Sequence, residues 1–328
     1  MSNGLRVGVI GASGIGQHHA RWHTLCGNDV VGFVGKSDST VARTAQRLTD
    51  YFGFSGRGYT SVSEMLETEA PDIVAVTSPY AMHKSHVLES IAFGAHVLCE
   101  KPLVWDEELT LDHILADGRE VVVAAHASDR LFGMTAQYPT SLPMYRELYR
   151  LVRGEWGEVD SVRMEMEVKR RGDRKLFESN WIDVASHPIS LVIALMGMGS
   201  IKPGTASCSV EEAECEASFV YASERGEANV SFVIRDIAQG VPLRRFGANG
   251  LMADWDGFAD PDGIYRASLA HGSHSLLGDD FLHSMIQSFT ESVLERQSDV
   301  LLGIEEALLN LELQVDLLRL ARDGVDAA

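Results

Sequence analysis

The segment from Gly94 to Leu103 places a lysine where it could do chemistry. It reads Gly-Ala-His-Val-Leu-Cys-Glu-Lys-Pro-Leu, so a short apolar strand ending at Cys99 leads straight into Glu100-Lys101-Pro102. Open α/β sheets bind their ligands at the carboxyl ends of such strands. A following proline disfavours the helical conformation, so the backbone itself restricts where Lys101 lies. We predict that Lys101 polarises a substrate oxygen or exchanges a proton, and that Glu100 orients it.

A glycine motif near the amino terminus points to a dinucleotide. Residues 5–10 form an apolar strand, a helix is predicted for 17–25, and the turn between them contains Gly11, Ser13, Gly14, Ile15 and Gly16. The first glycine permits a tight turn, the last allows close helix–strand packing, and the amides at the helix start would hold the pyrophosphate. Serine replaces the usual middle glycine, and its hydroxyl could contact a phosphate. The alternative is a glycine-rich turn without a nucleotide.

The residues after the second strand favour NADP(H) over NAD(H). An NAD site normally has an acidic residue here for the ribose 2′-hydroxyl. After the strand at 30–34 the chain instead reads Gly35-Lys36-Ser37, and Asp38 comes later, in the cap of the next helix. Lys36 and Ser37 would supply a charge and a hydroxyl to a 2′-phosphate. The alternative is that Lys36 is a solvated loop residue.

The remainder of the first half alternates helices with apolar strands. A strand at 72–76 ends in Thr77-Ser78-Pro79-Tyr80, and the last strand of this domain is predicted at Val121–Ala125. Undivided apolar strands separated by helices indicate a parallel sheet covered on both faces. We therefore predict an α/β dinucleotide-binding domain over residues 1–126. Its helices are expected at about 39–52, 61–68, 81–93 and 106–117.

From residue 127 the pattern changes to the alternation of half-buried strands. An antiparallel sheet with one face on helices and the other available for subunit contact fits this pattern. The second domain, 127–328, is thus predicted to be α+β with a large, open, mostly antiparallel sheet, and its last helix could pack back on the first domain. Strands are expected at about 159–168, 204–210, 215–222, 227–235, 243–247 and 250–255, and helices at 143–152, 278–296 and 303–321.

Composition excludes several classes of partner. The 328-residue chain carries 47 acidic and 28 basic residues, a net charge of -19, which disfavours nucleic acid and anionic membranes. No apolar run is long enough to span a membrane, and no signal-peptide core is present. The four cysteines lack CxxC spacing, which favours free thiols and a cytoplasmic protein. The twelve histidines show no metal-ligand spacing, so no metal site is predicted.

Together the glycine motif, Ser78-Pro79…His83 and Gly94…Glu100-Lys101-Pro102 resemble the Gfo/Idh/MocA oxidoreductases. The resemblance implies a Rossmann domain followed by a domain with an open antiparallel sheet, through which homodimers or homotetramers form. It implies that Ser78, Pro79, His83, Glu100 and Lys101 contact the cofactor, and that the Lys101–Pro102 bond is cis. The sequence departs from the family pattern at Ser13 and in lacking an asparagine near Tyr80.

The resemblance also implies an aspartate and a histidine four residues apart in the second domain. Asp183-Val184-Ala185-Ser186-His187 supplies them, before an apolar helix at 189–196. Residues at i and i+4 share a helix face, so the two side chains can converge. Lys101, Asp183 and His187 are then the catalytic set: His187 or Lys101 delivers the proton, and Asp183 orients the imidazole or holds a substrate hydroxyl. Trp181 is either a wall of the substrate pocket or a core residue.

These residues predict an NADP(H)-dependent oxidoreductase for a secondary alcohol or ketone of a sugar, cyclitol or related polyol. One alternative keeps the redox chemistry but acts on a non-sugar acid, aldehyde or imine. Its support is the basic run at 169–175, which could equally be a solvated loop. Another alternative is a non-catalytic ligand sensor, which would have no reason to keep Lys101, Asp183 and His187 together. A hydrolase is excluded, since no nucleophile-elbow motif or paired-carboxylate signature is present.

Overall fold

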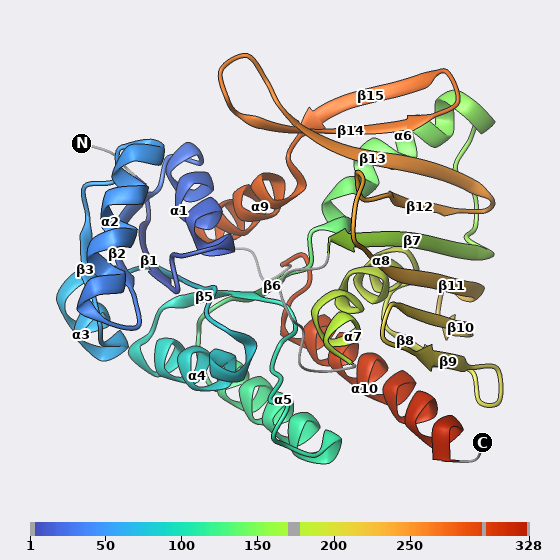
Figure 1. Cartoon of the computed structure of the whole chain (residues 1–328), viewed down its shortest axis with the longest axis horizontal. Helices are drawn as coiled ribbons and strands as arrows, with labels where there is room; N and C mark the ends of the chain where they lie inside the picture. Colours follow the sequence, from blue (N-terminus) through green and yellow to red (C-terminus); the bar gives the residue numbers. More distant parts are fainter. Residues whose placement is uncertain (1–3, 170–177, 297–299, 327–328) are drawn as a thin grey trace. The chain divides into compact units, whose positions relative to one another are not determined.

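The computed structural model describes residues 4–169, 178–296 and 300–326 (Figure 1). The chain divides into two compact units. The first comprises Met1–Ala136 with Leu282–Leu308, and the second comprises Gln137–Phe281 with Leu309–Ala328. The boundary near the carboxyl terminus falls within one long helix, α10 (Ile304–Asp326).

The described part of the first unit contains a sheet of six parallel strands in the order β3-β2-β1-β4-β5-β6. The apolar residues of its central strands are almost completely buried, as undivided apolar runs predict. The order reverses between β1 and β4, which is where doubly wound sheets bind nucleotides. The strands are β1 (Arg6–Ile10), β2 (Asp29–Val34), β3 (Arg57–Tyr59), β4 (Ile73–Val76), β5 (His96–Glu100) and β6 (Phe132–Thr135).

Helices cover both faces of this sheet. One face carries α1 (Ile15–Leu25), α2 (Asp38–Phe52) and α9 (Phe281–Glu295), and the other carries α3 (Val62–Glu69), α4 (His83–Phe93) and α5 (Leu111–His126) (Figure 1). The α9 helix is distant in sequence but packs on α1. Trp22 stacks on His283 with ring centroids 4.7 Å apart, and Asn28 donates a hydrogen bond to Thr290.

Two sequence predictions about this unit differ from the structure. Val121–Ala125 is the end of α5, not a strand: Val121 and Val122 are buried whereas Val123 is 68% exposed, a helical pattern that an apolar run conceals. The last strand is β6, which pairs with β5. Because β6 completes the sheet, the first unit extends to Ala136 instead of residue 126, and it also takes in Leu282–Leu308.

The second unit has a mostly antiparallel sheet, as the alternating pattern predicts. Its described strands run in the order β15-β14-β13-β12-β7-β11-β10-β8, with β9 paired to β10, and β7 and β11 are parallel. In β7, Val162, Met164 and Met166 are buried while Arg163 points outward. The strands are β7 (Ser161–Lys169), β8 (Gly199–Ile201), β9 (Ser207–Val210), β10 (Glu214–Ser223), β11 (Gly226–Ile237), β12 (Arg244–Ala248), β13 (Leu251–Ala259), β14 (Tyr265–His271) and β15 (His274–Asp279).

Helices of the second unit lie on one face of this sheet. The α6 helix (Leu142–Arg153) contacts β14 and β15, whereas α7 (Ser179–Val184) and α8 (Ser186–Met196) contact β11. Short 3-10 turns, η1 (Tyr80–Met82) and η2 (Tyr138–Ser141), precede α4 and α6 in the two units. Apart from Lys169, which ends β7, and Glu178, the segment 169–178 lies outside the described residues, and with it most of the basic run. None of the described helices has the length and apolar character needed to cross a bilayer.

Candidate active site

The glycine motif forms a tight loop between β1 and α1. Gly11 has φ of +93°, and its N–H donates to the Val34 carbonyl at 3.0 Å. A Cβ at Gly11 would lie 2.8 Å from the Ser78 nitrogen, and one at Gly16 would lie 2.4 Å from the Gly11 carbonyl oxygen. Both positions therefore require glycine because backbone approaches too closely for any side chain.

Thr77 closes this loop and was missed by the sequence analysis. Its hydroxyl lies 3.0 Å from the Ile10 carbonyl oxygen and 3.2 Å from that of Gly11, and its N–H donates to Ile10. The side chain is 7% exposed. The signal was a threonine directly after a buried strand, at the position where the strand order reverses.

The start of α1 lacks the side-chain cap found at the starts of α2, α3 and α5. Ser37, Ser61 and Thr110 each accept a hydrogen bond from a first-turn amide of α2, α3 and α5. At α1 the N-cap is Gly14, and no described side chain caps the helix. Residues 13–15 are exposed, so the start of α1 is accessible, as an anion site requires.

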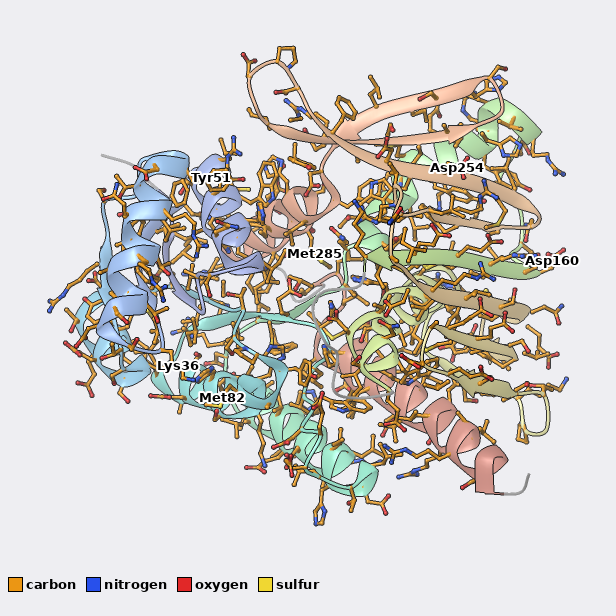
Figure 2. The ribbon with its side chains drawn as sticks, in the orientation of Figure 1. Lys36, Tyr51, Met82, Asp160, Asp254 and Met285 are labelled. Atoms are coloured by element: carbon orange, nitrogen blue, oxygen red, sulfur yellow. The ribbon has the colours of Figure 1, made fainter. Side chains whose placement is uncertain are left out.

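Lys36 and Ser37 follow β2 at the same edge of the sheet. Lys36 is exposed on the surface of the first unit (Figure 2). Ser37 is the N-cap of α2, and its hydroxyl lies 3.0 Å from the Thr40 hydroxyl. Asp38 is the first residue of α2, so its carboxylate belongs to the first helical turn, where it interacts favourably with the helix dipole.

His83 connects the two remaining loops of this edge. Its Nδ1 lies 2.9 Å from the Pro102 carbonyl oxygen and its Nε2 lies 2.9 Å from that of Ser78. The ring is 1% exposed, and burial lowers the pKa of His83 even though both carbonyls act to raise it. The Lys101–Pro102 bond is cis, which confirms the expectation from the resemblance. His83 thus holds the Ser78-Pro79 loop against the Lys101-Pro102 loop.

Glu100 is held by a second buried histidine. His19 Nε2 lies 2.8 Å from Glu100 Oε1, and the two side chains are 0% and 12% exposed. Burial acts to raise the pKa of Glu100, but the hydrogen bond with His19 and the charges of His19 and Lys101 outweigh it and lower the pKa to about 2. Glu100 is therefore a carboxylate at every physiological pH. No motif in the sequence singles out His19, because its partner Glu100 lies far along the chain.

In the second unit, Asp183 and His187 lie on two helices that meet at Ala185. Asp183 is exposed near the end of α7, and His187 is half-buried at the start of α8. The Ala185 N–H donates to Trp181, and its carbonyl accepts from Ile189, so helical turns continue through the junction. Asp183 and His187 therefore remain about one turn apart on the same side.

Two buried polar residues of α10 form hydrogen bonds with the backbone and side chains of this junction. Gln314 donates to the Trp181 and Ile182 carbonyls at 3.1 Å and accepts from the Ser186 hydroxyl at 3.1 Å. Asn310 donates to the Ser186 carbonyl at 2.9 Å. The two side chains are 0% and 1% exposed. Their signal in the sequence was a pair of amides within the apolar stripe of the last predicted helix.

Trp181 occupies the core of the second unit. It is 0% exposed, stacks on Phe232 with centroids 5.9 Å apart, and donates its indole N–H to the Gln314 carbonyl at 3.0 Å. This placement matches the core-packing alternative for Trp181.

An aromatic cluster beside His187 was not foreseen from the sequence. The Tyr138 ring lies 5.4 Å from the His187 ring and 5.1 Å from that of Trp255, over which the Arg244 guanidinium lies at 4.7 Å. The Tyr138 hydroxyl and the Trp255 indole N–H are buried without a hydrogen-bond partner in the described part of the chain. Burial raises the pKa of Tyr138, so it stays a hydroxyl donor. Unpaired buried donors are costly, and an ordered water or a ligand that supplies an acceptor would satisfy them.

Each unit thus gathers its own predicted site residues. The first brings the glycine loop, Lys36, Ser78, Glu100 and Lys101 to the carboxyl edge of its sheet. The second brings Asp183 and His187 to one helix junction. The catalytic set of Lys101, Asp183 and His187 draws on both units and stays a prediction.

A scan of family models matches residues 5–134 to GFO_IDH_MocA, described as "Oxidoreductase family, NAD-binding Rossmann fold". Residues 5–134 are thus similar to the Gfo/Idh/MocA family, in agreement with the resemblance seen in the sequence. Among curated relatives, the inositol 2-dehydrogenase of Ralstonia nicotianae is 38% identical over 125 residues, 37% of this chain and 33% of that protein. The 1,5-anhydro-D-fructose reductase of Ensifer adhaerens is 34% identical over 134 residues, 39% of this chain and 35% of that protein. The chain thus matches about a third of the length of each of these two relatives.

Solved structures resemble both units of this chain. A levoglucosan dehydrogenase in complex with NADH and levoglucosan aligns with a TM-score of 0.73 and 13% identity, covering 98% of each chain. At this identity the likeness shows the fold alone. It extends the structural similarity beyond the residues that the family model matches.

Proposed function

We propose that this chain is an NADP(H)-dependent oxidoreductase that transfers a hydride to or from a secondary alcohol or ketone of a sugar, cyclitol or related polyol. The observation that carries the proposal is one sheet edge in the first unit. There, a glycine loop with an uncapped helix start lies beside the Glu100-Lys101-Pro102 loop. The names of the curated relatives, which include inositol and sugar-derivative dehydrogenases, support this substrate class.

The cofactor choice is argued from charge. The first-turn amides of α1 would hold the pyrophosphate, and Lys36 would contact a 2′-phosphate beyond β2. The carboxylate that would repel this phosphate is absent from the end of β2, where the described chain has Gly35 and Lys36. Ser37 caps α2, so its hydroxyl could add a contact only while keeping that bond.

The proposed mechanism divides tasks among the chain's own residues. The bound nicotinamide would supply or accept the hydride. Lys101 would bind the reacting oxygen, with the Glu100 carboxylate, itself fixed by His19, keeping negative charge beside the ammonium. His187 would exchange the proton at that oxygen and Asp183 would orient its ring. Tyr138 and Trp255 would donate hydrogen bonds to further hydroxyls of a polyol.

Substitution of Lys101 tests this mechanism. Lys101→Ala is expected to lower kcat by about 10²–10⁴-fold, while nicotinamide fluorescence still reports cofactor binding. Lys202→Ala serves as a control, since Lys202 pairs with Glu227 on the second unit. The assay follows nicotinamide absorbance with NADP+ and NAD+ over sugars, inositols and sugar phosphates. Near-normal rates for Lys101→Ala would contradict the mechanism, and tighter NADH than NADPH binding would overturn the cofactor choice.

The alternatives are separated by the same screen. A panel silent with every sugar and cyclitol would favour a non-sugar acid, aldehyde or imine. A chain that binds polyols and cofactor but never transfers a hydride would be a ligand sensor. No described residue favours either alternative over the proposal, because the basic run at 170–175 lies outside the described residues.

We also propose a homodimer or homotetramer formed through the outward face of the nine-stranded sheet. A shallow hollow of about 530 Å³ lies on this sheet, with Arg163, Ser218 and Ser231 among its lining residues. A cytoplasmic location belongs to the same proposal, since the four cysteines, all within the described residues, are thiols rather than disulfides. Light scattering during size-exclusion chromatography would test the assembly, and a monomer at micromolar concentration would contradict it.

A further inference from the structure

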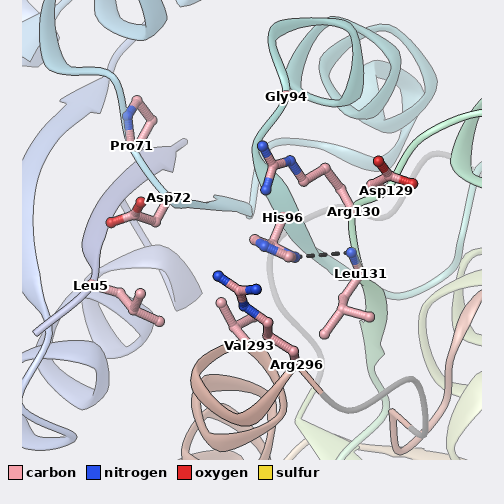
Figure 3. A pocket seen from close by; sticks show the side chains of 10 residues that line it. All are labelled: Leu5, Pro71, Asp72, Gly94, His96, Asp129, Arg130, Leu131, Val293 and Arg296. Carbon is pink, nitrogen blue, oxygen red and sulfur yellow. Dashed lines mark hydrogen bonds between the residues drawn. The ribbon is translucent and has the colours of Figure 1, made fainter.

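A cavity in the first unit lies at the amino-terminal ends of the sheet strands, opposite the proposed cofactor site at their carboxyl ends. It has a volume of about 540 Å³ and lies where strands β1, β4, β5 and β6 begin (Figure 3). Leu5, Asp72, His96 and Leu131 come from these strand starts, and Val293 and Arg296 come from the end of α9. No residue of the proposed active site lines it.

Two arginines and a histidine supply hydrogen-bond donors to this cavity. The Arg130 and Arg296 guanidiniums lie on either side of the His96 ring (Figure 3). Within the described residues, neither guanidinium forms an ion pair. Two arginines that share one concave surface, and that pair with no carboxylate of the described residues, favour an anion as the ligand.

The tautomer of His96 is set by the backbone. The Leu131 N–H donates to His96 Nδ1 at 2.9 Å, so Nδ1 carries a lone pair and the ring proton lies on Nε2. Burial and the Arg130 charge lower the pKa of His96, although Asp72 acts to raise it. The ring therefore stays neutral at physiological pH and retains one N–H donor beside the two guanidiniums.

The rest of the lining narrows the class of ligand. Asp72 and Asp129 also line the cavity, and one Asp72 oxygen accepts the Arg6 N–H at 2.8 Å. Carboxylates repel a bare anion but accept hydrogen bonds from hydroxyl groups. Leu5, Pro71, Leu131 and Val293 provide apolar surface for a carbon skeleton. An anionic head group with hydroxyls on a short carbon chain matches all three kinds of lining.

We infer that this cavity, centred on Arg130, His96 and Arg296, binds a small phosphate ester of a polyol. The phosphate lies between the two guanidiniums, whose planar sets of N–H donors match the phosphate oxygens. The hydroxyl groups of the polyol face Asp72 and Asp129. Because Arg130 precedes β6 and Arg296 follows α9, the phosphate joins two segments far apart in the sequence. Ligand binding therefore stabilises the first unit, independently of whether the proposed redox function holds.

Calorimetry on the full-length protein tests the inference with glycerol 3-phosphate, inorganic phosphate and glycerol as probes. Variants are Arg130→Gln and Arg296→Asn, since asparagine tolerates the left-handed φ of +54° at position 296. Arg47→Gln, an exposed arginine on α2, is the matched control. We expect glycerol 3-phosphate to bind in the millimolar range or tighter and to raise Tm. Each variant should weaken it at least tenfold, and Arg47→Gln should not.

The design separates this cavity from the proposed cofactor site. Binding of glycerol 3-phosphate that persists under saturating NADP+ supports the inference. Binding that is lost under NADP+, or that is unchanged in Arg130→Gln and Arg296→Asn, places the phosphate elsewhere and overturns it. Absence of binding to the wild-type protein at millimolar concentrations also overturns it. Equal affinity for inorganic phosphate and glycerol 3-phosphate overturns the assignment to an ester.

Discussion

In the first unit the candidate residues lie on loops that follow parallel strands, whereas in the second they lie on a helix junction held from behind by α10. The glycine loop is shaped by steric exclusion, because Gly11 lies against the backbone of the loop after β4 and Gly16 lies against the Gly11 carbonyl. The α7–α8 junction is shaped by hydrogen bonds from Gln314 and Asn310. The same task of fixing a side chain is thus met by excluded volume in one unit and by buried polar groups in the other.

This difference explains which residues are visible as motifs. The steric constraint on Gly16 comes from Gly11, which is close in sequence, so it leaves a short pattern. A buried amide can bond to a residue more than a hundred positions away, as Gln314 does to Trp181, so it leaves no short sequence pattern. The two kinds of support should also fail differently when single residues are changed.

Gly16→Ala should give the largest loss. The added Cβ would meet the Gly11 oxygen at 2.4 Å and the Thr77 hydroxyl at 2.5 Å, so the loop must move. Overpacking of this kind costs about 3 kcal/mol, which corresponds to roughly a hundredfold in cofactor affinity. Fluorescence titration measures it, with Gly157→Ala, where a Cβ has open space, as control. Unchanged affinity would show that excluded volume does not shape the first unit's site.

Gln314→Leu should give the next largest effect, and of a different kind. It leaves the Trp181 and Ile182 carbonyls and the Ser186 hydroxyl without their partner, which costs about 2–4 kcal/mol of unfolding free energy. Because the junction carries Asp183 and His187, we expect kcat to fall while cofactor affinity stays unchanged. Urea unfolding and steady-state kinetics measure both, with Asp316→Asn on the exposed side of α10 as control. A stable variant with normal kcat would show that hydrogen bonds from Gln314 do not position the α7–α8 junction.

The third prediction concerns acid stability of the first unit. Burial, followed by repulsion from His19, lowers the pKa of His23 from 6.5 to about 3. The unfolded chain therefore binds a proton that the folded chain does not, and stability is full above pH 6.5 and falls between 6.5 and about 3. The slope approaches about 1.4 kcal/mol per pH unit for this one group. His23→Phe should flatten the acid limb of unfolding free energy against pH, and His274→Gln, an exposed histidine, should leave it unchanged.

Lys36→Ala should give the smallest effect, because the side chain is exposed and its interactions are screened. NADPH affinity is expected to fall about five- to tenfold with NADH affinity unchanged. Fluorescence titrations at low and high salt measure this, and the difference should shrink with salt. Equal losses for both cofactors would mean that Lys36 supports the loop and not a 2′-phosphate.

Much of the fold was predictable because hydrophobic period and turn residues are local. The strands ending at Ile10 and Val34 lie where the sequence places them, and β5 ends at Glu100, just past its predicted end at Cys99. The alternation in β7, β10 and β11 gives the mostly antiparallel sheet. Val121–Ala125 was wrong because a run of apolar residues fits a buried strand and a buried helix equally well. The β14–β15 hairpin was missed, since serine, glycine and histidine dilute its alternation.

The local geometry around the candidate site was predictable where motifs are short and was missed where contacts join distant residues. Gly11, Gly16 and the Lys101-Pro102 loop stand where the motifs predict. Thr77, His19, Tyr138 and Gln314 were missed because each acts through an atom far along the chain. The sequence signals of such contacts are weak: for Gln314, an amide inside an apolar stripe, and for Thr77, a threonine directly after a buried strand.

The parallel pairing of β7 with β11 has a consequence for how the second unit folds. The hairpins β10–β11, β12–β13, β13–β14 and β14–β15 join strands that are neighbours in the chain. The β7 strand lies between the β10–β11 hairpin and the β12–β15 strands. It pairs with β11 on one side and β12 on the other, although it precedes both by many residues in the chain. Closing such long loops is slow, so we expect the hairpins to gain protection from hydrogen exchange first and docking of β7 to limit the folding rate.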